Sequence, residues 1–137
     1  MAKSVLVVDD IPFVRKTLVD ILTEAEYRVV GEAADGLQAV EMYARLQPDF
    51  VTMDIVMPNM SGIEATRKIV RMNKHAKVVI VTAMSQENIV MEAINAGARD
   101  YVLKPFRAEE ILRTLERIVV GDEKMLNRPQ GREQKTG

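Results

Sequence analysis

The sequence lacks cysteine, and its 137 residues carry a formal net charge of only -1. The absence of cysteine excludes a disulfide framework, a catalytic thiol and a thiolate metal site. The near balance of charge gives no indication of a nucleic acid or a membrane surface as the main partner. No apolar run approaches the roughly 20 residues that a membrane-spanning helix needs. The first residues lead directly into a strand pattern and leave no room for a signal peptide. We therefore expect a cytoplasmic protein.

The remaining composition is that of a globular chain, with 47% hydrophobic and 28% charged residues. A length of 137 residues fits one domain with a substantial core. We expect this domain to span residues 1–120, because the sequence after Val120 is polar, contains Gly and Pro, and has little to bury. Residues 121–137 are predicted to form a flexible C-terminal tail, with room for one more helical turn before Asn127.

Five short apolar segments alternate with five segments of helical periodicity. The predicted strands are Ser4–Val8, Arg28–Ala33, Phe50–Met53, residues 77–81 and Asp100–Leu103. The first, third and fourth are continuous apolar runs, which indicates burial on both faces. Pro12, and Ser61 with Glu64 three residues later, are typical of helix starts, whereas Gly97 is typical of a helix end. The alternation predicts an α/β fold with a five-stranded parallel sheet and helices on both faces.

Polar side chains follow four of the five predicted strands. They are Asp9 and Asp10 after the first strand, Asp54 after the third, Thr82 at the fourth and Lys104 after the fifth. In open parallel sheets, ligands bind at the carboxyl ends of the strands, so these groups are expected to share one edge. The alternative, in which each merely caps a helix or solvates a loop, does not explain why all of them fall at strand ends.

Each of these residue types has a role if the site handles phosphate. Three neighbouring carboxylates would raise one another's pKa, and a hard divalent cation such as Mg²⁺ relieves that repulsion. A carboxylate can also act as a nucleophile and form an aspartyl-phosphate. Lys104 is suited to neutralise phosphoryl oxygens, and the hydroxyl of Thr82 to donate a hydrogen bond to them. The sequence thus contains the parts of a metal-assisted phosphoryl transfer.

Four blocks of sequence resemble the receiver domain of two-component response regulators. The blocks are residues 5–10 (VLVVDD), 53–58 (MDIVMP), 81–83 (VTA) and 104–106 (KPF). The resemblance extends from about residue 4 to about residue 120 and is closest to the single-domain chemotaxis regulators. It implies a flavodoxin-like (βα)5 fold with strand order 2-1-3-4-5.

The resemblance implies that Asp54 accepts a phosphoryl group from a histidine kinase. It also implies a Mg²⁺ site, which Mn²⁺ can occupy as well. The expected ligands are the carboxylates of Asp9, Asp10 and Asp54 and the backbone carbonyl of Val56. The protein would then be a signalling switch that catalyses only its own phosphorylation and autodephosphorylation.

Further roles follow from the same resemblance. The phosphoryl group is expected to contact Thr82, the backbone of Ala83 and Lys104, with a cis peptide between Lys104 and Pro105. Thr82 and Tyr101 are the expected switch residues, with Tyr101 moving inward as Thr82 shifts. A half-buried tyrosine that only packs is the alternative for Tyr101.

The resemblance also implies an output surface. It is formed by the fourth helix, the fifth strand and the last helix, and includes Met91, Asn95, Arg99 and Tyr101. The expected partners are a histidine kinase, a target protein such as a flagellar motor switch protein, and a separate phosphatase, with no nucleic acid and no membrane. The protein itself is expected to be a monomer.

One departure from the enteric chemotaxis regulators concerns the lifetime of the phosphoryl group. Those regulators carry a polar amide two residues after the phosphoacceptor, where this sequence has Val56, and Met84 lies two residues after Thr82. Apolar groups at these positions cannot orient an attacking water. We therefore expect slow autodephosphorylation, or loss of the phosphoryl group through a separate phosphatase.

Three other functions are alternatives to a signalling switch. A phosphorelay intermediate would pass the phosphoryl group from Asp54 to a histidine phosphotransfer protein. A flavodoxin-like cofactor binder is disfavoured, because the first strand ends in two acids instead of the Ser/Thr/Gly loop that an FMN phosphate needs. The receiver of a DNA-binding regulator is a minor alternative, because no basic helix follows residue 120.

Overall fold

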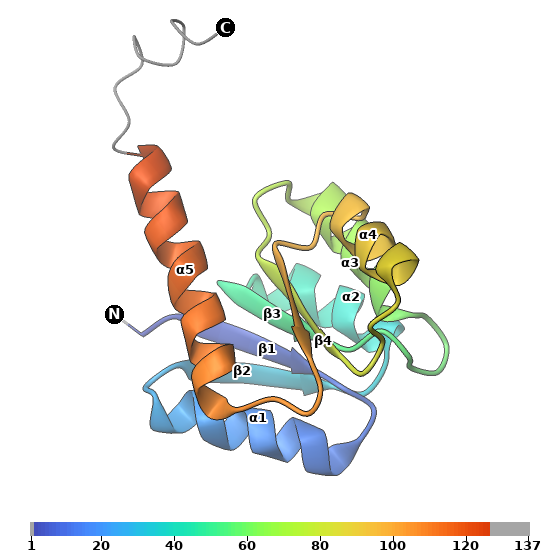
Figure 1. Ribbon diagram of the computed structural model, residues 1–137, viewed down its shortest axis with the longest axis horizontal. Coiled ribbons are helices and arrows are strands. Elements are labelled where there is room, and N and C mark those ends of the chain that lie inside the picture. The colour runs from blue at the N-terminus through green and yellow to red at the C-terminus, as the bar shows by residue number, and fades with distance from the viewer. Residues whose placement is uncertain (1, 127–137) are drawn as a thin grey trace, which may run out of the picture.

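The computed structural model describes residues 2–126 of the chain (Figure 1). Strands and helices alternate from the first strand to the last helix. The strands are β1 (Ser4–Val8), β2 (Arg28–Ala33), β3 (Phe50–Met53), β4 (Val78–Thr82) and β5 (Asp100–Leu103). The helices are α1 (Pro12–Glu24), α2 (Gly36–Leu46), α3 (Gly62–Met72), α4 (Glu87–Asn95) and α5 (Ala108–Leu126). Within residues 2–126, no helix has both the length and the apolar character needed to cross a membrane.

The five strands form one parallel sheet in the order β2-β1-β3-β4-β5, which confirms the predicted fold and strand order. The strands are in register near their carboxyl ends: Val8 pairs with Met53, and Met53 pairs with Ile80. On the other side of β4, Val81 pairs with Val102. The residues that follow β1 and β3 therefore leave the centre of the sheet side by side.

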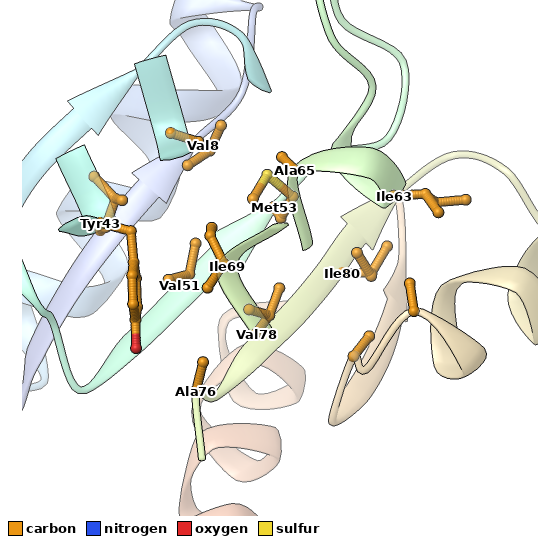
Figure 2. Close-up of a cluster of buried hydrophobic side chains, with 14 of the residues drawn as sticks. Val8, Tyr43, Val51, Met53, Ile63, Ala65, Ile69, Ala76, Val78 and Ile80 are labelled. Atoms are coloured by element: carbon orange, nitrogen blue, oxygen red, sulfur yellow. The ribbon is translucent and has the colours of Figure 1, made fainter. Parts of the chain in front are cut away.

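The sheet lies between two helical layers, because alternate residues of a strand face opposite sides. On one face, α1 and α5 pack through Leu18, Leu22, Ile111 and Leu115 against the residues of β1, β3, β4 and β5 that point that way. On the other face, α2, α3 and α4 cover a second cluster. Part of this cluster is drawn in Figure 2, with side chains that include Val8, Tyr43, Val51, Met53, Ile69 and Ile80.

The ends of several helices follow the local rules predicted from the sequence. Pro12 is the first residue of α1, where its missing N–H leaves no backbone partner unsatisfied. The Ser61 hydroxyl caps α3 by accepting a hydrogen bond from the Glu64 N–H at 3.1 Å. Gly97 follows α4 with φ +113°, a conformation that a side chain would strain.

Helix α5 continues through residues 121–126, so the first part of the predicted tail is helical. Asp122 ties this part of the helix to the rest of the domain. Its carboxylate accepts a hydrogen bond from Arg99 at 2.7 Å and lies 3.4 Å from the ammonium of Lys77. The rest of the predicted tail, residues 127–137, lies outside the described residues.

Replacing Asp122 with Asn should lower the free energy of unfolding at neutral pH by about 1 kcal/mol or less, as expected for a partly exposed ion pair. Partial burial raises the pKa of Asp122, but the hydrogen bonds and charges of Arg99 and Lys77 outweigh it, and the pKa lies below its usual value. A carboxyl group with a lowered pKa stabilises the fold above its unfolded pKa, and this stability is lost as the pH falls through the folded pKa.

Urea denaturation of the parent and of Asp122→Asn at several pH values measures this contribution. The difference in unfolding free energy should be present at pH 7 and should fade below about pH 4. A difference that grows on acidification would contradict the assigned ion pairs.

Candidate functional site

The carboxyl edge of the sheet carries the polar groups that the sequence places at strand ends. Asp9 directly follows β1, Asp54 follows β3, Thr82 ends β4 and Lys104 follows β5. β1 and β3 are neighbours, yet the helices that follow them, α1 and α3, lie on opposite faces of the sheet. Such a switch point opens a crevice beyond the strand ends, which is where ligands bind in this class of sheet.

Three carboxylates meet in this crevice. Asp9, Asp10 and Asp54 each present a carboxylate oxygen, and these atoms all lie within 4.8 Å of one another. Backbone N–H groups orient two of them: Ile11 donates to Asp9 Oδ1 at 2.9 Å, and Ile55 donates to Asp54 Oδ1 at 2.7 Å. Asp9 and Asp54 are buried, and Asp10 is half-buried.

Lys104 joins two of these carboxylates. Its ammonium donates to Asp9 Oδ2 at 2.8 Å and to Asp54 Oδ2 at 3.1 Å. Burial raises the pKa of Asp9, and the hydrogen bond from Lys104 offsets this only in part. Burial lowers the pKa of Lys104, but the two carboxylates outweigh it and hold the pKa above its usual value. The lysine therefore stays charged against the acidic pocket.

The donor set fits a hard divalent cation. Carboxylate oxygens are the ligands that Mg²⁺ prefers, and it usually takes one or two of them together with water and phosphate oxygens. Three carboxylates and one ammonium leave a formal charge of -2 in the pocket. A divalent cation would neutralise that charge, so Asp9, Asp10 and Asp54 could hold one.

The loop between β3 and α3 begins with Asp54. Val56, whose backbone carbonyl is an expected metal ligand, lies in this loop and is 63% exposed. The loop is tied to the start of α2: Asn59 donates to Asp35 Oδ2 at 2.7 Å, and the Gly36 N–H donates to the Met60 carbonyl at 3.2 Å. No sequence pattern pointed to this contact between Asp35 and Asn59.

The expected switch residues are both hydrogen-bonded to the backbone of Met84. The Met84 N–H donates to the Thr82 hydroxyl at 3.5 Å, and the Met84 carbonyl accepts a hydrogen bond from the Tyr101 hydroxyl at 2.6 Å. Tyr101 is half-buried and packs against the cluster beneath α2, α3 and α4. Its pKa is raised by burial and by the charge of Asp54.

The ends of β4 and β5 are joined as well. The Lys104 N–H donates to the Thr82 carbonyl at 2.8 Å, and the peptide bond between Lys104 and Pro105 is cis. Thr82 is buried, whereas Ala83 beside it is exposed. The structure thus brings the expected phosphoryl contacts to the same edge as the three carboxylates.

Fold and site together define a parallel α/β protein with an acidic, lysine-containing pocket suited to a phosphoryl group and a divalent cation. Residues 5–116 match the family model of the response regulator receiver domain, and the chain belongs to this family. Receiver domains are signalling switches that take phosphoryl groups from histidine kinases, act on target proteins and bind Mg²⁺ at an acidic pocket.

Several characterised proteins are similar over most of the chain. The chemotaxis protein CheY of Thermotoga maritima is 48% identical over 118 residues, which cover 86% of this chain and 98% of that protein. The protein CcdB of Bacillus subtilis is 50% identical over 115 residues, or 84% of this chain and 96% of that protein. The CheX–CheY–BeF₃–Mg²⁺ complex of Borrelia burgdorferi contains a chain that is 33% identical with a TM-score of 0.83, covering 85% of this chain and 89% of that one.

Replacing Gly62 with Ala should disturb the backbone of the acidic site. A Cβ at this position would overlap the carbonyl oxygen of Asp54, a backbone atom that cannot turn aside. We expect a loss of about 3 kcal/mol in the free energy of unfolding, at the upper end for an overpacked position.

Gly121→Ala is the matched control. A Cβ there meets nothing within 4 Å, and the residue lies inside α5, so alanine should raise stability by up to about 1 kcal/mol. Urea denaturation compares the two variants with the parent. Equal stability of Gly62→Ala and the parent would contradict the close approach of α3 to Asp54.

Proposed function

We propose that residues 1–120 act as a single-domain phosphorylation switch in which Asp54 accepts a phosphoryl group from a histidine kinase. The observation that supports this most is the ion pair of Lys104 with Asp9 and Asp54, beside a third carboxylate from Asp10. A buried cluster of this kind stabilises the fold poorly, since burial of charges is expensive. It is suited instead to a charged ligand.

The chemistry follows from the positions of these groups. A carboxylate oxygen of Asp54 attacks the phosphorus of the donor phosphohistidine, an O–P bond forms and the P–N bond breaks. The electron pair of that bond stays on the ring nitrogen, and the imidazole leaves neutral because its other nitrogen is already protonated. Asp9, Asp10, Asp54 and the backbone carbonyl of Val56 would hold Mg²⁺, which would supply positive charge to neutralise the phosphoryl oxygens. Lys104 contacts the same oxygens as a point charge.

The remaining phosphoryl contacts come from the end of β4. The Thr82 hydroxyl and the backbone N–H of Ala83 donate to phosphoryl oxygens. Phosphorylation brings nearly two negative charges to a site that already contains three carboxylates. The response passes from Thr82 through the backbone of Met84 to Tyr101. A change of a few kcal/mol is enough to invert the populations of two conformations.

The output surface lies on α4, β5 and α5 and includes Met91, Asn95, Arg99 and Tyr101. The first three of these residues are exposed, although the guanidinium of Arg99 also pairs with Asp122. Chemotaxis is the proposed pathway, because several relatives of 42–48% identity carry the name chemotaxis protein CheY. A cytoplasmic flagellar motor switch protein is the corresponding target, and the protein acts as a monomer. The CheX–CheY complex supports a separate phosphatase as a further partner.

A second candidate function is that of a phosphorelay intermediate, which passes the phosphoryl group on to a histidine phosphotransfer protein. The exposed apolar side chain of Val56 favours it, since a shuttle needs a phosphoryl group that water does not remove quickly. The similar protein CcdB also carries a name unrelated to chemotaxis. Transfer from phosphorylated Asp54 to purified candidate partners distinguishes the two functions.

Labelling with acetyl phosphate tests the phosphoacceptor. Intact-protein mass spectrometry should detect one phosphoryl group on the parent with Mg²⁺ present and none after chelation. Asp54→Asn should not be labelled, because the amide is no nucleophile here. Asp20→Asn, on the exposed face of α1, is the control and should be labelled like the parent. Mg²⁺-dependent labelling of Asp54→Asn would overturn the assignment.

Replacing Val56 with Asn tests the expected slow autodephosphorylation. The amide can orient a water toward the phosphoryl group, so we expect a faster loss of phosphate, by up to about 100-fold, the low end of the effect of a group positioned for proton transfer. Because Val56 is 63% exposed, the fold should be unaffected. Val56→Ala, which removes bulk without adding a polar group, should keep the parent rate. The same rate in Val56→Asn and the parent would refute the explanation.

A further inference from the structure

Arg15 of α1 contacts the backbone of Asp9, whose carboxylate is bound by Lys104. Its Nη1 donates to the backbone carbonyl of Asp9 at 2.7 Å, and its Nε donates to Glu32 Oε1 of β2 at 3.3 Å. The arginine side chain is 21% exposed, compared with 48% for Glu32. Helix α1 packs on β1 and β2, so the guanidinium spans from the helix to the first acidic residue and on to the edge strand.

The contact with Arg15 completes the hydrogen bonding of Asp9. The Asp9 N–H donates to the Ala33 carbonyl at 3.0 Å, and the two carboxylate oxygens accept from Ile11 and Lys104. The carbonyl is the remaining polar group of the residue, and Arg15 donates to it. Asp9 is therefore held at both ends of its backbone as well as at its side chain.

Asp10 is held differently. Within residues 2–126, no hydrogen bond or ion pair is formed by its carboxylate, although that carboxylate is one of the three that converge within 4.8 Å. Its place in the pocket is consequently set by the backbone. The peptide between Asp9 and Asp10 is planar, so the direction of the Asp9 carbonyl fixes the positions of the nitrogen and Cα of Asp10. Arg15 is the side chain that holds this carbonyl.

We propose that Arg15 is a positioning residue of the pocket, which orients the Asp9–Asp10 peptide and thereby places the Asp10 carboxylate for a divalent cation. The inference rests on the proposed function only for the nature of the ligand. Arginine suits the task because its fork of donors can bond a carbonyl and a carboxylate at the same time. Lysine has one nitrogen at its end, which cannot occupy the positions of both Nε and Nη1 of Arg15.

An effect of Arg15 through charge alone would have the opposite sign. Removing a positive charge beside an acidic pocket makes the pocket more negative, which strengthens the binding of a cation. Removing a positioning contact weakens the binding, because Asp10 is then no longer held for the ion. The direction of the change in Mg²⁺ affinity therefore distinguishes the two explanations.

Isothermal titration calorimetry of the full chain with MgCl₂ provides the test. Arg15→Gln should raise the Kd for Mg²⁺ about tenfold, the lower end of the effect of removing a residue that orients a metal ligand. Lys16→Gln is the matched control, since it removes one positive charge from the next residue of α1. The Lys16 side chain is 75% exposed and, within residues 2–126, pairs only with Asp20 of the same helix, so the Kd of this variant should stay at the parent value.

Arg15→Lys keeps the charge and should also weaken Mg²⁺ binding. If Arg15→Gln does not fold, the affinity of Arg15→Lys for Mg²⁺ tests the positioning role instead. Labelling by acetyl phosphate gives a second measurement. The Mg²⁺ concentration for half-maximal rate should rise by the same factor as the Kd, while the rate at saturating Mg²⁺ returns to that of the parent. Damage to the whole fold would lower the rate at every Mg²⁺ concentration.

The outcomes separate this inference from the proposed function. If Asp10→Asn weakens Mg²⁺ binding and folded Arg15→Gln and Arg15→Lys bind as tightly as the parent or more tightly, the role of Arg15 is refuted and the metal site stands. If the parent itself does not bind Mg²⁺, both the proposed function and the inference fail. Weaker binding in the Arg15 variants, with Lys16→Gln unchanged, supports the proposal.

Discussion

The pocket depends on one ammonium group, that of Lys104, placed between two buried carboxylates. Asp9 and Asp54 have side chains that are 1% and 7% exposed, and without a cation the two charges would repel each other in a site with little water. Lys104 comes from the end of β5, and β4 separates that strand from β3. The electrostatic balance of the pocket therefore requires the complete sheet, in this strand order.

The sheet also sets the backbone on which these groups stand. Hydrogen bonds between neighbouring strands continue one residue past the strand ends. The backbone N–H of Asp54 donates to the Val8 carbonyl at 3.1 Å, and the backbone N–H of Lys104 donates to the Thr82 carbonyl at 2.8 Å. Each reactive side chain is thus anchored where the regular ladder stops, which leaves its functional atoms beyond the sheet and its backbone within it. Substitutions in the strand interior act on the site through this backbone.

The sequence predicted the sheet and the strand ends because both have local signatures: continuous apolar runs, followed by acids or a lysine. Contacts between distant segments have no such signature. Arg15 looks like an ordinary helix residue, and its acceptor is a backbone carbonyl, which every residue possesses. The contacts at the end of α5 also lack a local signature in the sequence. The polar composition after Val120 left room for one more helical turn before Asn127, and α5 continues to Leu126. It did not show that Asp122 pairs with Arg99 and Lys77, which come from other elements.

The proposed signal can leave the pocket without breaking a strong bond. The Thr82 hydroxyl accepts the Met84 N–H at 3.5 Å, which is long, while its own proton remains available for a phosphoryl oxygen. The bond from the Tyr101 hydroxyl to the Met84 carbonyl is short, at 2.6 Å. A movement of Thr82 toward a phosphoryl group would therefore release the Met84 N–H first, which would leave the Met84 backbone able to move together with Tyr101. Because one bond is long and the other short, we expect the loop after β4 to change conformation. Tyr101 belongs to β5, so this strand takes part in the response.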